Sequence, residues 1–247
     1  MHPLDNVIWQ ALTTRQTHCA EIYGDARWFL RDITLLSAFR EPSDQGYDSL
    51  AKLAGPGGTA ALFLNEPYRP RPGWELLADP PLLQMIFENG SLPASPAAAN
   101  STIVELGQKD SPEMVELATL TKPGPFGSRT HELGTYLGIR RQAGERVGER
   151  ISERVSEVIE QDRLVAMAGE RLKVPGYTEV SAVCTHPEHT GQGYAGILMT
   201  EVMRRIIARG ETPFLHTRED NARAVELYRR LGFKTRLRSH LALLRRI

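Results

Sequence analysis

The segment that most narrows the fold is 183–196, which reads VCTHPEHTGQGYAG. An apolar strand-like run ends here, a glycine-rich turn follows, and an amphipathic helix is predicted to begin at or just after Gly193. Glycine lacks the Cβ that would crowd a ligand at such a turn. The amides of the first helical turn have no partner inside the helix and lie at the positive end of its dipole. A strand, a glycine-rich turn and a helix N-terminus together predict a cradle for phosphate or pyrophosphate.

Two other phosphate-binding turns do not fit the spacing. No Lys-Ser or Lys-Thr pair ends the turn, so it is not a nucleotide-triphosphate P-loop. The full G-x-G-x-x-G spacing is also missing, which disfavours a dinucleotide fold. Since a glycine-rich turn can also be a plain tight connection, the interpretation depends on the neighbouring segments.

The segment 214–233, FLHTREDNARAVELYRRLGF, supplies the second signal. Asn221 and Tyr228 are seven residues apart, so a helix presents them on one face, and Gly232 is placed to end that helix. The second half of the chain follows an α/β pattern. Its predicted strands are 101–106, 135–140, 164–171, 177–185, 213–217 and 233–244, and its predicted helices are 112–121, 193–209 and 221–231.

A strand-ending turn for pyrophosphate, followed by a helix presenting Asn and Tyr, resembles the GNAT superfamily of acetyl-CoA-dependent N-acetyltransferases. The resemblance covers roughly residues 101–247. The family's turn reads Arg or Gln, two residues, Gly, one residue, then Gly or Ala, and segment 190–195 (TGQGYA) matches it except at its first position. Thr190 there weakens the expected side-chain support of the loop but leaves its backbone amides intact.

The resemblance implies an α/β fold with a mixed, mostly antiparallel sheet flanked by helices over 103–247. It also implies that acetyl-CoA is the acyl donor. The end of the strand would splay from its neighbour and bind the pantetheine arm, and the turn would bind the pyrophosphate. The expected cofactor-binding residues are Ala182, Val183, Cys184, Thr185, Thr190, Gly191, Gln192, Gly193, Tyr194, Ala195, Gly196 and Asn221.

Tyr228 and Glu179 are the expected catalytic residues. By resemblance, Tyr228 would protonate the leaving thiolate as a general acid; the alternative is a half-buried aromatic on a packing helix. Glu179 lies on the strand 177–185 and, by alternation, on the same side as Ser181 and Val183. The resemblance implies that Glu179 acts as general base, directly or through water; the alternative is a glutamate that faces solvent. His216 and His131 are further base candidates.

Cys184, His186 and His189 form a dense Cys-x-His-x-x-His pattern. A structural zinc site needs a fourth ligand and usually two separated pairs, and this segment also has to shape the turn. We therefore expect no metal.

The expected reaction is direct acetyl transfer from acetyl-CoA to a primary amine in a ternary complex. The expected acceptor is a small-molecule or peptide amine. The resemblance implies that the loop 123–134, with Phe126, Arg129 and His131, shapes its pocket. Covalent catalysis by Cys184 is disfavoured. A non-catalytic acyl-CoA-binding or sensing module is the alternative function.

Residues 1–92 are expected to form a smaller α/β accessory domain that packs on the other or shapes its substrate, joined through a linker at 93–102. The linker sequence is small, polar and Pro-containing. In the accessory domain a helix is predicted over 26–40 and strands over 59–64 and 74–77. Residues 144–159 repeat a four-residue unit, which indicates either a protruding element for homodimerisation or partner binding, or a surface insertion.

Charge and hydropathy exclude several partner classes. Thirty basic and thirty acidic side chains cancel, so the broad positive field of a nucleic-acid or anionic-membrane binder is absent. No apolar run approaches the roughly 18 residues of a membrane span. The first residues, MHPLDNVIWQALTT, lack the regions of a signal peptide, and two cysteines form no disulfide framework. The expected location is the cytoplasm.

Overall fold

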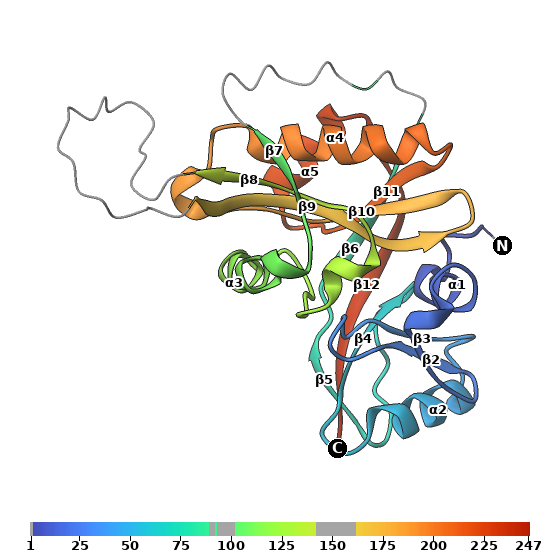
Figure 1. Cartoon of the computed structure of the whole chain (residues 1–247). Helices are drawn as coiled ribbons and strands as arrows, with labels where there is room; N and C mark the ends of the chain where they lie inside the picture. Colours follow the sequence, from blue (N-terminus) through green and yellow to red (C-terminus); the bar gives the residue numbers. More distant parts are fainter. Residues whose placement is uncertain (1, 89–91, 93–101, 142–161) are drawn as a thin grey trace, which may run out of the picture.

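The computed structural model of the chain describes residues 2–88, 92, 102–141 and 162–247 (Figure 1). The α-helices are α1 (Val7–Thr13), α2 (Asp44–Ala54), α3 (Ser111–Thr121), α4 (Tyr194–Ala208) and α5 (Ala222–Arg230). The strands are β1 (Ala20–Tyr23), β2 (Ala26–Phe29), β3 (Ser37–Phe39), β4 (Thr59–Leu64), β5 (Trp74–Ala78), β6 (Pro81–Phe87), β7 (Ile103–Leu106), β8 (Tyr136–Arg141), β9 (Arg163–Val174), β10 (Tyr177–Thr185), β11 (Thr212–Arg218) and β12 (Phe233–Arg246).

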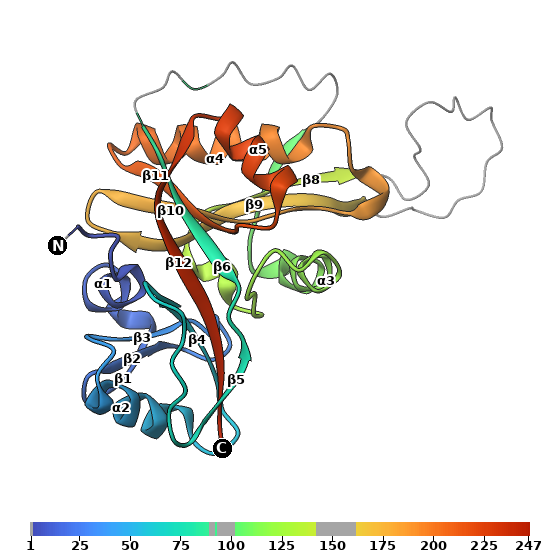
Figure 2. The ribbon, with the colours of Figure 1, turned by 180° about the vertical axis from the view of Figure 1, so that it is seen from behind.

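The main sheet has the strand order β4-β12-β6-β11-β10-β9-β8-β7, with β5 also paired to β12. Only β10 and β11 are parallel neighbours, and the other pairs described in this sheet are antiparallel. Helices α4 and α5 cover one face, and α1 and α3 lie on the opposite face (Figures 1 and 2). The predicted mixed, mostly antiparallel sheet flanked by helices is confirmed.

The expected boundary near residue 92 does not separate two sheets. Strand β6 belongs to the first 92 residues, yet it lies between β12 and β11 of the second part. Five residues of β6 are buried, so its apolar sequence PLLQMIF is typical of an internal strand. Of the described strands, β1, β2 and β3 alone form a separate small sheet. The linker expected at 93–102 lies outside the described residues except for Thr102.

The predicted helix over 26–40 is wrong. Strands β2 and β3 occupy that segment and pair antiparallel. Side chains on both sides of β2 are buried, with Trp28 and Phe29 fully inaccessible. Because side chains on both faces of this segment are buried, its apolar residues do not alternate as in a half-buried strand. Their spacing resembles that of a helix, which explains the error. Helices α1 and α2 and strands β1 and β6 were not predicted.

The remaining predicted elements agree with the structure to within a few residues. The predicted helix 112–121 is α3, 193–209 is α4 and 221–231 is α5. The packing of α4 explains its position: Leu198, Val202 and Ile206 are fully buried in the core between this helix and the sheet. The repeat at 144–159 lies outside the described residues. No helix in the described part of the chain is long and apolar enough to cross a membrane.

Candidate active site

Strands β10 and β11 form a V at the centre of the main sheet. They pair only over Tyr177–Glu179 and Thr212–Phe214, near the start of each strand. Beyond these residues β10 stays paired with β9, while β11 stays paired with β6 and no longer pairs with β10. The edge of β10 that faces β11 therefore offers unpaired backbone groups to a ligand, as an open strand edge does in strand addition. The expected splay of the strand end is present.

A β-bulge in β10 lies beside this V. The register with β9 shifts between Ser181 and Cys184, and Ala182 adopts a φ of 52°. A bulge inserts one extra residue and re-aims the side chains that follow. Glycine is the residue that usually occupies the left-handed region, and an alanine there is uncommon. Because position 182 is an alanine, the sequence does not mark the bulge.

The bulge changes which face of the sheet each side chain occupies. Val180 and Val183 contact the core under α4, whereas Ala182 and Cys184 contact the core under α3. Strict alternation would have placed Val183 on the face of Glu179. That expectation is wrong for Val183, because Glu179 lies on the opposite face with Arg171.

The glycine-rich turn has the geometry of an anion cradle. Gly191 and Gly193 have φ values of 83° and 77°, which L-residues adopt only with strain, and no atom lies within 4 Å of the position of a Cβ at either. Gly193 is the N-cap of α4. The first-turn amides of α4 therefore face open space at the positive end of the helix dipole. The exposed Thr190 donates its hydroxyl hydrogen to Pro187 O at 3.0 Å.

A cavity of about 740 Å³ connects the turn, the V and α5. Every expected cofactor-binding residue except Ala182 lines it, as does Tyr228. The cavity also has nine lining residues that the sequence analysis did not place in the cofactor or catalytic set: Thr121, Lys122, Pro123, His189, Arg223, Ala224, Leu227, Arg230 and Leu231. The spacing of Arg223 and Arg230, seven residues apart on one predicted helix, is the signal that could have revealed two cations beside the cradle.

Gln192 and Tyr194 stabilise the turn from the side of β8. The Tyr194 hydroxyl hydrogen-bonds to the Gln192 side chain, and Arg141 Nε donates to the same hydroxyl at 3.0 Å. Tyr194 is buried. These contacts hold the turn through positions other than Thr190, which compensates for the departure there from the family pattern.

Asn221 has a structural contact as well as a place in the cavity. Its side-chain oxygen accepts a hydrogen bond from Ala224 N at 3.2 Å, so Asn221 is the N-cap of α5. Because the side-chain oxygen is used for capping, the NH₂ group of this exposed side chain remains available to a ligand in the cavity.

Tyr228 and Cys184 lie at the inner end of the cavity. Burial raises the pKa of Tyr228 to about 12, with a smaller contribution from Cys184, so the phenol stays protonated at neutral pH. Its hydroxyl makes no hydrogen bond within the described residues. Burial also raises the pKa of the Cys184 thiol, to about 11, which disfavours this residue as a nucleophile.

Glu179 is not solvent-facing, and its surroundings argue against a role as general base. It is fully buried, and both of its oxygens accept hydrogen bonds from Arg171 at 2.8 Å. Burial alone would raise its pKa, but the Arg171 charge and the hydrogen bonds from Arg171 and His216 lower it to about 2. A carboxylate held in this way is a weak proton acceptor.

His216 is brought to Glu179, with its Nδ1 2.7 Å from Glu179 Oε1. Arg236 Nη1 donates to Gln84 Oε1 at 2.7 Å, which directs the Gln84 NH₂ at His216 Nε2, 3.1 Å away. The Nε2 lone pair is therefore occupied, and Nδ1–H donates to Glu179. His216 lies two residues beyond the last backbone pair of β10 and β11, so this hydrogen bond links the two strands at the vertex of the V.

The loop 123–134 contributes only Pro123 to the cavity. Arg129 forms ion pairs with Asp32 and Glu132, which attach the loop to the first part of the chain. His131 Nε2 lies 3.0 Å from Gln108 Oε1, and Phe126 stacks edge-on against Tyr136. The structure therefore does not bring Arg129 and His131 into the cavity.

Tyr136 is a buried polar residue that the sequence analysis did not single out. Its side chain is inaccessible, and its hydroxyl has no hydrogen-bond partner among the residues that the structure describes. Burial raises the pKa of Tyr136, and the charges of Arg171 and Glu179 act on it as well. The opposing residue is Gly169, where a Cβ would lie 2.3 Å from the ring. A glycine in the interior of a strand, which leaves room for a large side chain on the neighbouring strand, is the sequence signal that could have pointed to this tyrosine.

Cys184, His186 and His189 do not converge. The two imidazole rings lie edge to face, 5.9 Å apart, while Cys184 points into the core under α3. Across residues 2–88, 92, 102–141 and 162–247, no three His, Cys, Asp or Glu side chains are grouped as metal ligands.

Comparison with known proteins relates this geometry to a family. The family model described as FR47-like protein matches residues 157–241. A GNAT-family structure from Novosphingobium aromaticivorans DSM 12444 is 35% identical, with each chain covered over 100% of its length and a TM-score of 0.83. No curated protein matches this chain.

A GCN5-related N-acetyltransferase from Kribbella flavida is 17% identical, with a TM-score of 0.60 over 98% of this chain and 96% of the other, and thus shares the fold. The Novosphingobium structure matches the whole chain, so the likeness includes the first 92 residues. The chain therefore belongs to the GNAT family of acetyltransferases.

Proposed function

We propose that the protein transfers the acetyl group of acetyl-CoA to a primary amine, directly and within a ternary complex. The observation that carries the proposal is the position of Tyr228, a protonated phenol in the same cavity as the glycine-rich turn. One cavity thus combines a diphosphate cradle with a proton donor.

Backbone groups would hold most of the donor. The first-turn amides of α4 suit the pyrophosphate, with Arg223 and Arg230 adding positive charge at the cavity wall. The free edge of β10 at Val183–Thr185 suits the amides of the pantetheine arm. These contacts direct the thioester toward the vertex of the V.

In the transfer step the amine nitrogen forms a bond to the thioester carbonyl carbon, and the carbon–sulfur bond then breaks. Tyr228 gives its phenolic proton to the departing sulfur, and the proton lost by the amine nitrogen balances the reaction through solvent. The products are an amide and the free thiol of CoA. Because the thioester is already activated, no acyl-enzyme is needed.

The acceptor amine would lose its first proton to water. The described residues that line the cavity include no carboxylate, and Glu179 and His216 are held in the buried hydrogen bonds described above. The imidazole among the described lining residues, His189, is a weaker base than a free histidine, because burial lowers its pKa. An ordinary alkylamine has a pKa of about 10.4, so its neutral fraction rises about tenfold per pH unit below that value. The rate at low acceptor concentration should rise in parallel. A plateau near neutral pH, independent of the amine, would instead indicate a base on the protein.

The alternative is a non-catalytic module that binds acyl-CoA. The lack of a carboxylate among the described cavity residues favours it. A screen of small-molecule and peptide amines with acetyl-CoA, with detection of the released thiol, separates the two functions. We expect amine-dependent thiol release and an acetylated product by mass spectrometry. Tight acetyl-CoA binding without turnover for any amine would favour the module.

A further inference from the structure

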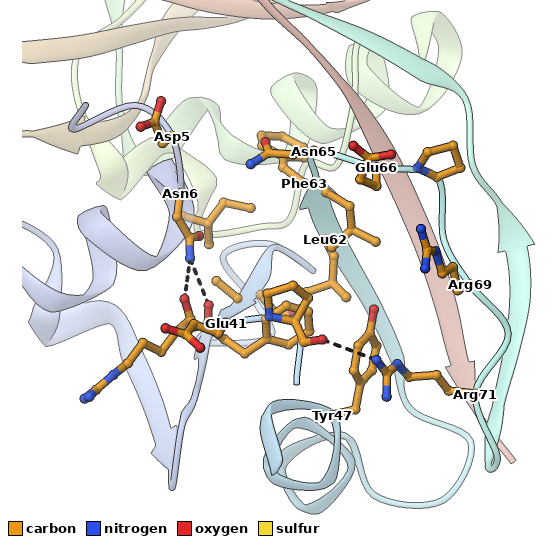
Figure 3. A pocket seen from close by; sticks show the side chains of 18 residues that line it. Asp5, Asn6, Glu41, Tyr47, Leu62, Phe63, Asn65, Glu66, Arg69 and Arg71 are labelled. Carbon is orange, nitrogen blue, oxygen red and sulfur yellow. Dashed lines mark hydrogen bonds between the residues drawn. The ribbon is translucent and has the colours of Figure 1, made fainter. Parts of the chain in front are cut away.

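A second cavity, of about 440 Å³, lies in the first part of the chain (Figure 3). Its inner wall is apolar and buried, and its lining comes from α1, β3, α2 and β4. The buried apolar lining residues are Ile8, Ala38, Phe39, Tyr47 and Leu62. The volume lies within the range of small-molecule sites, about 300 to 1,000 Å³.

This cavity is separate from the active-site cavity. The two have no lining residue in common. Strands β12, β6 and β11 lie between β4, which lines the second cavity, and the V beside β10. At about 4.8 Å per strand, the distance across them is on the order of 15 to 20 Å. A small amine bound here would not reach a thioester in the V.

The mouth of the cavity carries charges of both signs. Asp5 and Arg71 are already paired, with Arg236 and Asp44 respectively. Glu41, Glu66 and Arg69 make no ion pair with the described residues, and all three are exposed. Glu66 and Arg69 belong to one loop on the same side of the cavity, opposite Glu41 (Figure 3).

We infer that this cavity binds a free α-amino acid with a large apolar side chain. The side chain would lie on the apolar wall, the carboxylate would meet Arg69, and the ammonium would meet Glu66. A ligand with only an ammonium would face Arg69 with like charge, and one with only a carboxylate would face Glu66. A zwitterion satisfies both, and neither charge has to be buried.

Titration calorimetry of the full chain with phenylalanine tests this inference without any acyl-CoA, so the result does not depend on the proposed transferase activity. Two related probes separate the charges, since phenethylamine lacks the carboxylate and 3-phenylpropionate lacks the ammonium. Phenylalanine should bind more tightly than either. Arg69→Gln should weaken phenylalanine and 3-phenylpropionate about tenfold and spare phenethylamine, because a hydrogen bond to a charged group contributes about 1.5 kcal/mol or more.

Glu66→Gln should show the reverse pattern, weakening phenylalanine and phenethylamine while sparing 3-phenylpropionate. Arg238→Gln is the matched control, since Arg238 is an exposed arginine paired with Glu219 and lines neither cavity. No binding at millimolar phenylalanine, or binding that neither Arg69→Gln nor Glu66→Gln changes, would overturn the inference. Acetylation of the bound phenylalanine with a KM raised by both variants would also overturn it, because the cavity would then belong to the acceptor.

Discussion

The two cavities are built from different parts of the chain. The active-site cavity is formed largely by backbone: two left-handed glycines, the first turn of α4 and the free edge of β10. The second cavity depends on side chains at its mouth, such as Glu66 and Arg69, and on a wall assembled from four elements. Backbone recognition requires glycines at fixed spacing and leaves a motif in the sequence. A side-chain pocket leaves none, because each residue is an ordinary surface or core residue in its own segment.

The largest effect should come from a side chain in the backbone-built cavity. Tyr228→Phe keeps the ring volume and the packing against Phe233, so the fold and the CoA affinity should change little. The transfer rate should fall by roughly 10²- to 10⁴-fold, the usual contribution of a positioned general acid. Single-turnover kinetics with one accepted amine measure it.

Equal rates for wild type and Tyr228→Phe would assign protonation of the thiolate to water. The deficit should shrink with an activated ester as acyl donor, since its leaving group needs less protonation. Circular dichroism of both proteins checks that the fold is unchanged.

The second effect concerns the buried ion pair between Arg171 of β9 and Glu179 of β10, beside the vertex of the V. Glu179→Gln leaves Arg171 buried without its carboxylate, and breaking such a pair typically costs about 3 to 5 kcal/mol of unfolding free energy. The pKa of Glu179 is lowered from 4.5 to about 2, so its contribution is fully present above about pH 4.5 and is lost as the pH falls toward 2. Denaturant unfolding of wild type should lose stability in this window, and Glu179→Gln should lose less there.

His216→Ala provides a related test of the vertex of the V. If its hydrogen bond with Glu179 sets the separation of β10 and β11, this variant should raise the KM for the acyl donor more than it lowers kcat. A uniform loss of stability with unchanged KM would limit His216 to a role in packing.

These residues also show where sequence reasoning ends. The turn at 190–195 and the two helices beside it could be predicted because glycine spacing and helical period are local. The burial of Glu179 could not be predicted, because its partner Arg171 lies on the adjacent strand. The alternation of side chains along a strand shows which of them share a face of the sheet, but not which elements pack on that face. The bulge at Ala182 reverses that alternation without a glycine to mark it. Strand β6 was missed because its place between β12 and β11 depends on pairing with segments far along the chain.

A smaller effect is expected at Gly196, which lines the active-site cavity within the first turn of α4. Its φ is not in the left-handed region, and a Cβ would meet only Leu227 Cδ1 at 3.7 Å. Gly196→Val can therefore fold without backbone strain while placing methyl groups over the cradle. CoA affinity measured by calorimetry should fall roughly 10- to 100-fold, the loss of one charge-assisted hydrogen bond.

Gly196→Ala is the matched control, because it adds only the Cβ and stabilises the helix by roughly 0.5 to 1 kcal/mol. It should retain most of the CoA affinity. Gly193→Val is a poorer test, since a φ of 77° strains any L-residue and mixes misfolding with loss of binding. Unchanged affinity in a folded Gly196→Val protein would contradict the assignment of the cradle.

The smallest effect is expected at Thr190, where the chain departs from the family's turn. If backbone amides hold the pyrophosphate, the side chain here contributes little, and Thr190→Gln should change the Kd of CoA by less than about threefold, or about 0.7 kcal/mol. The reason is local: Thr190 is exposed and, within the described part of the chain, its hydroxyl bonds to Pro187 O alone. Arg141, Tyr194 and Gln192 hold the turn from the other side. A Gln192→Ala variant should weaken CoA binding more than Thr190→Gln does, because it releases Tyr194 from this network. If Thr190→Gln instead tightens CoA binding tenfold, a side chain at position 190 contributes substantially to holding the pyrophosphate. The turn would then be a side-chain site like the second cavity, and the contrast between the two cavities would not hold.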